Sequence, residues 1–330
     1  MKAKLLAGLS VALYFAASGR AQSTDEMARI AQSPYEIERF VEKTPAFEWE
    51  PLWKALHIQE EIVLPSCEER LDATRDCGSE LITINEPAQV LLLLRHELSG
   101  FETYLRFFPE NAANGTVHWR FAGHFEPYVK YFPPTHKVAI IGTEPYLQVT
   151  GQGNAGTCLN TEVEDWIDLT RMNFEPVFSY TVKGNRCGGH TPDRSIRGIV
   201  VSVKTQRKPS ITVSYSVEFS VTLESGTELN LGSRTDKVVY VRNQGQNYQI
   251  ENALSTLSAK QVERVYGNLD EDLTPEEYFR YDLVQLKEIA TGPESPEKKC
   301  LGSFLRTSPA SPEKSTLDRL LGRDPTKQPR

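Results

Sequence analysis

Residues 211–223 read ITVSYSVEFSVTL, a stretch in which apolar and polar residues alternate strictly. Every odd position is aliphatic or aromatic, and every even position is Thr, Ser or Glu. Alternation with a period of two places all the apolar side chains on one face of a β-strand. At about 3.3 Å per residue, the strand would be roughly 40 Å long. The alternation therefore predicts a sheet with one face packed against other elements and the other face exposed to water.

The neighbouring sequence supplies partner strands and a cover. GIVVSVKT precedes the stretch, and KVVYV and NYQIE follow it. Two helix starts with capping boxes come next, the first formed by Ser258 with Gln261 and the second by Thr274 with Glu277. Residues 191–291 are therefore predicted to form an antiparallel meander covered by two helices.

The rest of the chain divides by periodicity and composition. Residues 22–66 predict short helices, one of them opened by the capping signal of Ser33-Pro34-Tyr35-Glu36, and residues 67–190 are rich in strand patterns. Residues 292–330 are rich in Pro, Ser and charge, which predicts a disordered tail. The predicted fold class is mainly β (α+β), with antiparallel sheets forming a sandwich or a curved sheet, N-terminal helices and two C-terminal covering helices.

Residues 1–21 have the three-part pattern of a secretory signal peptide. Lys2 and Lys4 precede an uncharged apolar run, and Gly19 and Ala21 are small residues suited to cleavage after Ala21. The run is too short to span a bilayer as a resident helix, and no later segment approaches 18 apolar residues. The protein is therefore expected to be secreted or periplasmic, without integral membrane insertion.

The charge balance bears on partners. The chain has a formal net charge of −7, and loss of Lys2, Lys4 and Arg20 with the leader would make it −10 (−7 − 3). An acidic surface without a basic stripe repels phosphate backbones, so a nucleic-acid partner is not expected. The expected partner is an unknown ligand or an envelope protein.

The five cysteines are typical of an oxidising compartment. Cys67 and Cys77 are separated by the turn-like segment EERLDATRD, and Cys158 and Cys187 bracket strand-like sequence. We predict the disulfides Cys67–Cys77 and Cys158–Cys187, one of the three pairings that four cysteines allow. Cys300 would be left over.

The stretch TGQGNAGT contains the pattern G-x-G-x-x-G at Gly151, Gly153 and Gly156. A dinucleotide site needs a helix that opens at the third glycine, inside a strand–helix–strand unit. Here the sequence continues with Thr157-Cys158-Leu159, which is a poor helix former. The glycines therefore indicate a wide turn, and no cofactor is predicted.

Histidine spacing does not predict a metal site. His118 and His124 would share one face of a strand about 20 Å apart, too far to bind one ion. Cys187 lies close to His190 in the sequence, but an oxidising compartment favours a disulfide over a thiol nucleophile. No G-x-S-x-G elbow of a serine hydrolase is present.

Carboxylates cluster around one tryptophan. A solvated strand edge accounts for such a cluster, and a calcium site or a carboxylate pair for glycoside cleavage are the functional alternatives. The candidate catalytic residues are Glu162, Glu164, Asp165 and Asp168. The candidate ligand-contact aromatics are Trp119, Tyr128 and Trp166.

Two functions follow from these observations. The first is an exported, non-catalytic β-rich envelope or extracellular protein that binds a small apolar ligand, a glycan or a protein partner. A curved sheet under helices can enclose an apolar pocket, and exposed aromatic rings can stack on sugars. The alternative is a secreted hydrolase, directed at glycans, that uses the carboxylates near Trp166.

Overall fold

A computed structural model of the chain describes most of the residues that follow the predicted leader. The described residues are 24–44, 48–58, 77–96, 102–111, 115–127, 132–154, 158–188, 191–205, 208–243, 245–253, 257–267 and 272–323. The predicted signal peptide, Cys67 and Tyr128 lie outside them.

Two antiparallel sheets form the body of the molecule, and each is a meander in which strands adjacent in sequence are adjacent in space. The small sheet contains β1 (Cys77–Asn85), β2 (Ala88–His96), β3 (Glu102–Asn111) and β4 (Val117–Phe125). The large sheet contains β5 (Thr135–Ile141), β6 (Glu144–Asn154), β7 (Leu159–Asp168), β8 (Pro176–Arg186), β9 (Asp193–Lys204), β10 (Ser210–Thr222), β11 (Glu228–Val241) and β12 (Gln249–Ala253). The predicted fold class is confirmed.

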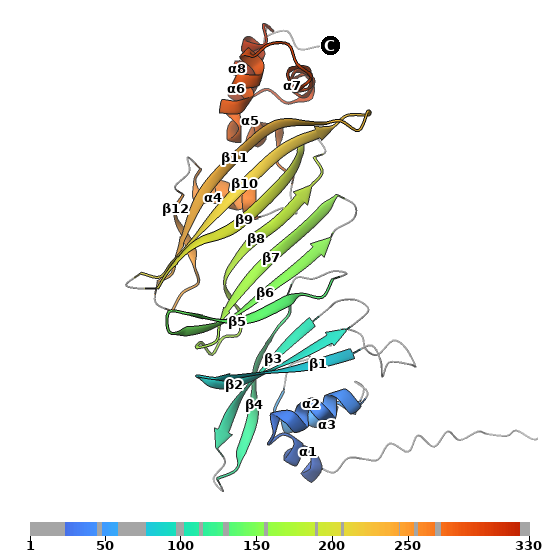
Figure 1. Cartoon of the computed structure of the whole chain (residues 1–330), viewed down its shortest axis with the longest axis vertical. Coiled ribbons are helices and arrows are strands. Elements are labelled where there is room, and N and C mark those ends of the chain that lie inside the picture. Colours follow the sequence, from blue (N-terminus) through green and yellow to red (C-terminus); the bar gives the residue numbers. More distant parts are fainter. Residues whose placement is uncertain are drawn as a thin grey trace, which may run out of the picture.

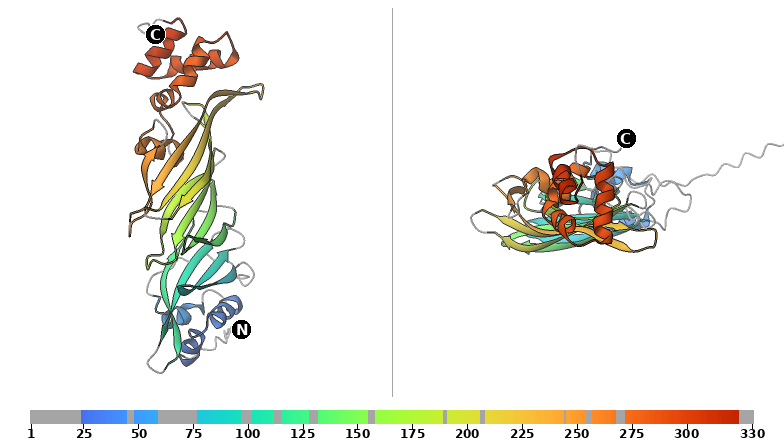
Figure 2. Two further views of the ribbon diagram at one scale, coloured as in Figure 1. Left: turned by 60° about the vertical axis from the view of Figure 1, so that its left-hand side comes forward. Right: turned by 90° about the horizontal axis from the view of Figure 1, so that it is seen from above.

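Helices lie at both ends of an elongated molecule and on one side of the strands (Figures 1 and 2). The N-terminal group, next to the small sheet, is α1 (Thr24–Ile30), α2 (Pro34–Lys43) and α3 (Glu50–Ala55). The C-terminal group is α4 (Ala259–Val262), the π-helix η2 (Glu263–Gly267), α5 (Pro275–Tyr281), α6 (Leu283–Thr291), α7 (Pro296–Thr307) and α8 (Pro312–Leu320). The apolar residues of this second group share one core with the large sheet.

The strand that decides the fold is β10. Its odd positions from Ile211 to Phe219 are buried, as the alternation predicts, while Val221 is half-buried and Leu223 is exposed. The pairing of β10 with β11 shifts register between Phe219 and Ser220. The β10–β11 hairpin then extends beyond the other strands (Figure 1), so its last apolar residues lie outside the covered part of the sheet.

Both predicted capping boxes are present. The Ser258 hydroxyl accepts a hydrogen bond from the Gln261 amide, and the Thr274 hydroxyl accepts one from the Glu277 amide. In return, the side chains of Gln261 and Glu277 accept from the backbone amides of Ser258 and Thr274. The helices differ in length from the prediction. The first has one turn of α-helix and continues as η2, and the second ends at Tyr281, so that α5 and α6 are separate helices.

The prediction of a disordered tail over residues 292–330 is wrong for the described part, which forms α7 and α8. Each helix begins with a serine cap followed by proline, Ser295-Pro296 and Ser311-Pro312. Leu301, Leu305 and Leu317 are fully buried in the core of the C-terminal helices. These three leucines supply apolar contacts for the two helices, although the composition of the tail is mostly polar.

The two sheets are joined through a common core and a buried cation. Arg106 of β3 has no exposed surface, and its guanidinium donates to Gln89 Oε1 at 2.7 Å, to Leu169 O at 2.6 Å and to Arg171 O at 2.5 Å. Its Cζ lies 4.4 Å from the ring centroid of Phe108. Because its acceptors are Gln89 of the small sheet and two carbonyls of the turn after β7, Arg106 fixes this turn against the small sheet.

Candidate functional site

The large sheet departs from regular pairing between β8 and β9. These strands pair only from Lys183 to Arg186 and from Arg194 to Arg197 in the described register. At the next position the two backbones still approach closely, because a Cβ added at Gly198 would lie 2.2 Å from Thr181 O. Ser179 to Thr181 of β8 are outside the described β8–β9 register.

The segment that follows β11 returns to β8. The Tyr248 amide donates to Val177 O at 2.8 Å. The Phe178 ring centroid lies 5.0 Å from that of Tyr240 and 5.6 Å from that of Tyr248. Arg242 donates to Tyr146 Oη at 2.8 Å. These contacts hold the β11–β12 connection against β6 and β8.

The curled sheet, α4 and η2 surround a cavity of about 520 Å³, which we call the tyrosine pocket. Four tyrosines from different parts of the sheet contribute to it, together with small polar and aliphatic side chains. The lining residues are Val163, Ser179, Tyr180, Thr181, Tyr215, Tyr240, Tyr248, Gln249, Ile250, Ala259, Val262, Glu263 and Gly267. A concave site of this size, with aromatic rings and a few polar groups, is typical of small-molecule binding.

The tyrosine hydroxyls of the pocket stay protonated near neutral pH. Burial raises the pKa of Tyr180, Tyr215, Tyr240 and Tyr248 above the usual tyrosine value. The nearby Glu164 carboxylate further raises the pKa of Tyr180. Tyr215 Oη and Tyr240 Oη are hydrogen-bonded at 3.0 Å. The pocket therefore presents neutral rings and hydroxyls that can donate or accept.

A π-helix forms one wall of the pocket, and such segments occur frequently at functional sites. The almost fully buried Arg194 donates to the η2 carbonyls of Arg264, at 3.0 Å, and Val265, at 3.3 Å. Burial lowers the pKa of Arg194 to about 10, so the side chain is still cationic at neutral pH. The Tyr266 ring stacks on Tyr215 at a centroid distance of 4.7 Å. These contacts fix η2 against the sheet.

The predicted carboxylates do not converge on a common point. Glu164 accepts from the Trp166 indole at 2.6 Å, and Asp165 accepts from Ser179 Oγ at 2.5 Å. Because these two acids are consecutive in β7, their side chains leave opposite faces of the strand. Glu162 lies two residues before Glu164 in β7, beside Lys183 of β8 in the register.

Asp168, the fourth predicted carboxylate, is only 1% exposed, and its oxygens are bonded to neighbouring residues. It is ion-paired with Arg242 and accepts from the amide and the hydroxyl of Thr170. Burial acts to raise the pKa of Asp168, but the bonds from Thr170 and Arg242 outweigh it, and the pKa is lowered overall. This pair ties the β11–β12 connection to the end of β7.

Of the three aromatic residues predicted to contact a ligand, the structure describes two. Trp166 is 4% exposed and packs between Tyr146 and Phe178, so the expectation of an exposed ring for sugar stacking is wrong. Trp119 is half-buried against the core of the N-terminal helices. Tyr128 lies outside the described residues. None of the three lines the tyrosine pocket among the residues that the structure describes.

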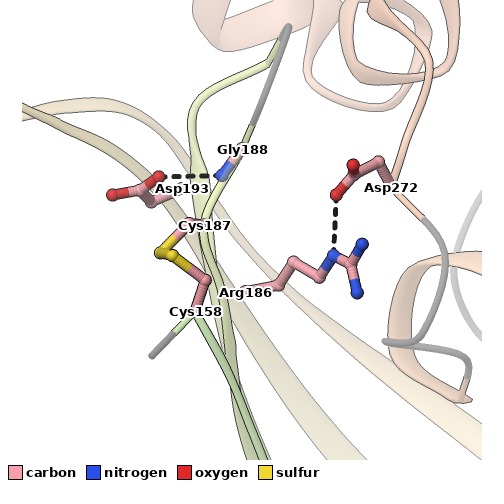
Figure 3. The surroundings of a disulfide bond; sticks show 6 residues. All are labelled: Cys158, Arg186, Cys187, Gly188, Asp193 and Asp272. Carbon is pink, nitrogen blue, oxygen red and sulfur yellow. Dashed lines mark hydrogen bonds and ion pairs between the residues drawn. A yellow bond between two sulfur atoms is a disulfide. The ribbon is translucent and has the colours of Figure 1, made fainter. Parts of the chain in front are cut away.

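The disulfide Cys158–Cys187 is present and confirms that part of the predicted pairing (Figure 3). The two Cα atoms are 5.0 Å apart, and the Cys187 amide donates to Cys158 O at 2.9 Å. Next to it, Arg186 Nε contacts Asp272 Oδ1 at 2.7 Å. The disulfide thus joins β7 to β8 where β8 contacts the segment leading into α5. Cys67 of the predicted Cys67–Cys77 pair lies outside the described residues, and Cys300 is a free thiol in α7.

The remaining sequence motifs occupy ordinary positions. Gly151 and Gly153 are part of β6 and pair with Val163 and Thr161 of the antiparallel strand β7, whereas Gly156 is not described. No group of three His, Cys, Asp or Glu side chains suited to a metal ion occurs among the described residues. Within the same residues, no helix has the length and apolar character needed to cross a membrane.

Comparisons with protein-family models, with curated proteins and with solved structures find no match to this chain. Its site is therefore interpreted from its own geometry.

Proposed function

We propose that this chain is an exported, non-catalytic protein that acts by binding a small ligand in the tyrosine pocket. The observation that carries the proposal is the cavity of about 520 Å³ between the curled sheet and the π-helix. Two groups of contacts maintain the cavity: the Arg242 network on one side and the bonds from Arg194 to η2 on the other. Both involve side chains that are largely removed from solvent.

Export is supported by two independent features. The N-terminal 21 residues have the pattern of a signal peptide. The disulfide Cys158–Cys187 is of a kind that persists in oxidising compartments. Together they favour a periplasmic or extracellular protein.

Binding is favoured over glycan hydrolysis by the placement of the carboxylates. Glycoside cleavage needs two carboxyl groups that flank one bond. Here Glu164 and Asp165 leave opposite faces of β7, and Asp168 is ion-paired and buried. This placement of three of the four carboxylates supports binding over glycan hydrolysis.

Native mass spectrometry of the full chain, exported to a periplasm with its own leader, tests the proposal. We expect an adduct of a small molecule that is released on unfolding. Ala259→Trp places an indole in the pocket and should abolish the adduct. Ala310→Trp, at an exposed site between α7 and α8, is the matched control and should retain it. If both variants and the parent carry the same adduct, or if none binds any small molecule from a periplasmic extract, the proposal is wrong.

A further inference from the structure

We infer that the ligand of the tyrosine pocket is an organic cation with a quaternary or alkylated ammonium group. This inference rests on the proposed binding function and specifies its ligand class. Three features of the pocket support it: its aromatic rings, its carboxylates, and the absence of basic side chains from its described lining.

The first feature is the concentration of tyrosine. Tyr180 of β8, Tyr215 of β10, Tyr240 of β11 and Tyr248 just before β12 all line one cavity. The face of an aromatic ring attracts a cation that lies within about 6 Å of the centroid, and clusters of such rings recognise quaternary ammonium groups. The protein already makes one contact of this kind, because Arg242 Cζ lies 5.8 Å from the Tyr248 centroid.

The second feature is the sign of the local charge. Glu263 of η2 lines the pocket. Glu164 is close to the lining, because its carboxylate accepts a hydrogen bond from Tyr180 Oη at 3.4 Å. The described lining contains no Lys, Arg or His. Arg242, whose guanidinium lies beside the Tyr248 ring, is ion-paired with Asp168. An anionic ligand would therefore meet carboxylates without a basic partner, whereas a cation would be attracted by them.

The third feature is the size and polarity of the remaining lining. A volume of about 520 Å³ leaves room for more than a trimethylammonium group. Ser179, Thr181 and Gln249 offer hydrogen bonds, and Val163 and Ile250 offer apolar contact. The ligand should therefore combine an ammonium head with a larger part that carries both polar and hydrocarbon groups.

A pair of isosteric probes tests the charge requirement directly. Choline and 3,3-dimethylbutan-1-ol have the same shape, but only choline is charged. Binding to the full mature chain, freed of any adduct by unfolding and refolding, would be measured by calorimetry and saturation-transfer NMR. We expect choline to bind at least about tenfold more tightly than the alcohol.

Two matched pairs of variants locate the effect. Tyr248→Leu removes a ring and should weaken choline binding several-fold, while Tyr248→Phe keeps the ring and should leave it nearly unchanged. Glu263→Gln should weaken choline without affecting the alcohol. Glu224→Gln, in the turn between β10 and β11, makes the same change in net charge away from the pocket and should have no effect.

The outcomes separate this inference from the proposed function. Equal affinity for choline and the alcohol, or an adduct identified as neutral or anionic, would overturn the cation class while leaving a binding protein. Failure of choline to bind at millimolar concentration would also overturn the cation class. A parent chain that carries no adduct and binds nothing from an extract would refute the proposed function itself.

Discussion

Asp282 connects α5 to α6 and is the most perturbed carboxyl group in the C-terminal core. It is 4% exposed, its Oδ2 has no hydrogen-bond partner, and a Cβ at Gly232 would lie 2.6 Å from that atom. Burial raises its pKa from the ordinary 3.8 to about 7, with a further contribution from Asp236 and opposition from Arg234. At pH 8 the protein therefore holds an unfavourable buried charge between the sheet and the helices.

Asp282→Asn should remove the dependence of stability on this ionisation. A folded-state pKa above the unfolded value means that the proton stabilises the fold below about pH 4, and that this stabilisation is lost as pH rises to about 7. Each pKa unit corresponds to about 1.4 kcal/mol. We expect the variant to be more stable than the parent by on the order of 1–4 kcal/mol at pH 8, with little difference at pH 4. Denaturant unfolding across this range measures it, and a pH-independent difference would contradict it.

The tyrosine pocket shows why single residues were hard to predict. Trp166 and its neighbouring carboxylates are conspicuous in the sequence, but Tyr146 and Phe178 of the neighbouring strands bury the ring, and the alternation of β7 separates Glu164 from Asp165. Tyr240 and Tyr248 belong to unremarkable strand sequence, and they meet Phe178 only because the β11–β12 connection returns to β8. The signal that was available is the aromatic residue within the alternation of β10, Tyr215, whose inward direction the pattern predicts.

Elements were predictable wherever a local pattern specifies them. The alternation of β10 and the capping boxes at Ser258 and Thr274 depend on residues close in sequence, and all three are present. The composition of residues 292–330 predicts disorder wrongly, because average composition does not register the helix caps within the tail. Ser295-Pro296 has the same form as Ser33-Pro34, which correctly predicted the start of α2.

The contribution of α8 to the core can be measured with two leucines of the same helix. Leu317 is fully buried, whereas Leu320 is 38% exposed. Leu317→Ala should lower the free energy of unfolding by about 2–5 kcal/mol, because it leaves a cavity among α6, α7 and α8. Leu320→Ala should change it by less than about 1 kcal/mol. Equal effects of the two substitutions would mean that α8 does not dock as described.

The disulfide that joins β7 to β8 should stabilise this end of the two strands. Cys158 and Cys187 are 29 positions apart, and a link across such a loop is worth about 2–4 kcal/mol. Replacing both cysteines by serine should lower the melting temperature by several degrees. Cys300→Ser removes a thiol that forms no disulfide in the structure and serves as the control, with little change expected. A double variant as stable as this control would show that the link contributes nothing.

The arrangement of the two sheets lies beyond what local patterns specify. Their junction depends on Arg106, whose acceptors Gln89 and Leu169 are distant in sequence, and the described register of β8 with β9 covers only Lys183 to Arg186. Meander order was predictable because strands adjacent in sequence usually pair. The end of the β8–β9 ladder was not, because it is decided by packing between segments that sequence alone does not bring together. The tyrosine pocket is lined by the part of β8 that follows this point in the structure, Ser179 to Thr181, so the sequence did not predict it.

The proposed export of the protein can be tested on the intact chain. Cleavage after Ala21 should give a mature protein that begins at Gln22, with Cys158 and Cys187 oxidised. Ala21→Tyr places a large residue at the cleavage site, where a small one is required, and should leave the precursor uncleaved. Ser23→Tyr lies beyond the site and should be processed normally. Intact-mass measurement of periplasmic and cytosolic fractions distinguishes these results. A mature mass that retains the first 21 residues in the parent would refute the signal-peptide assignment and remove one of the two supports for export.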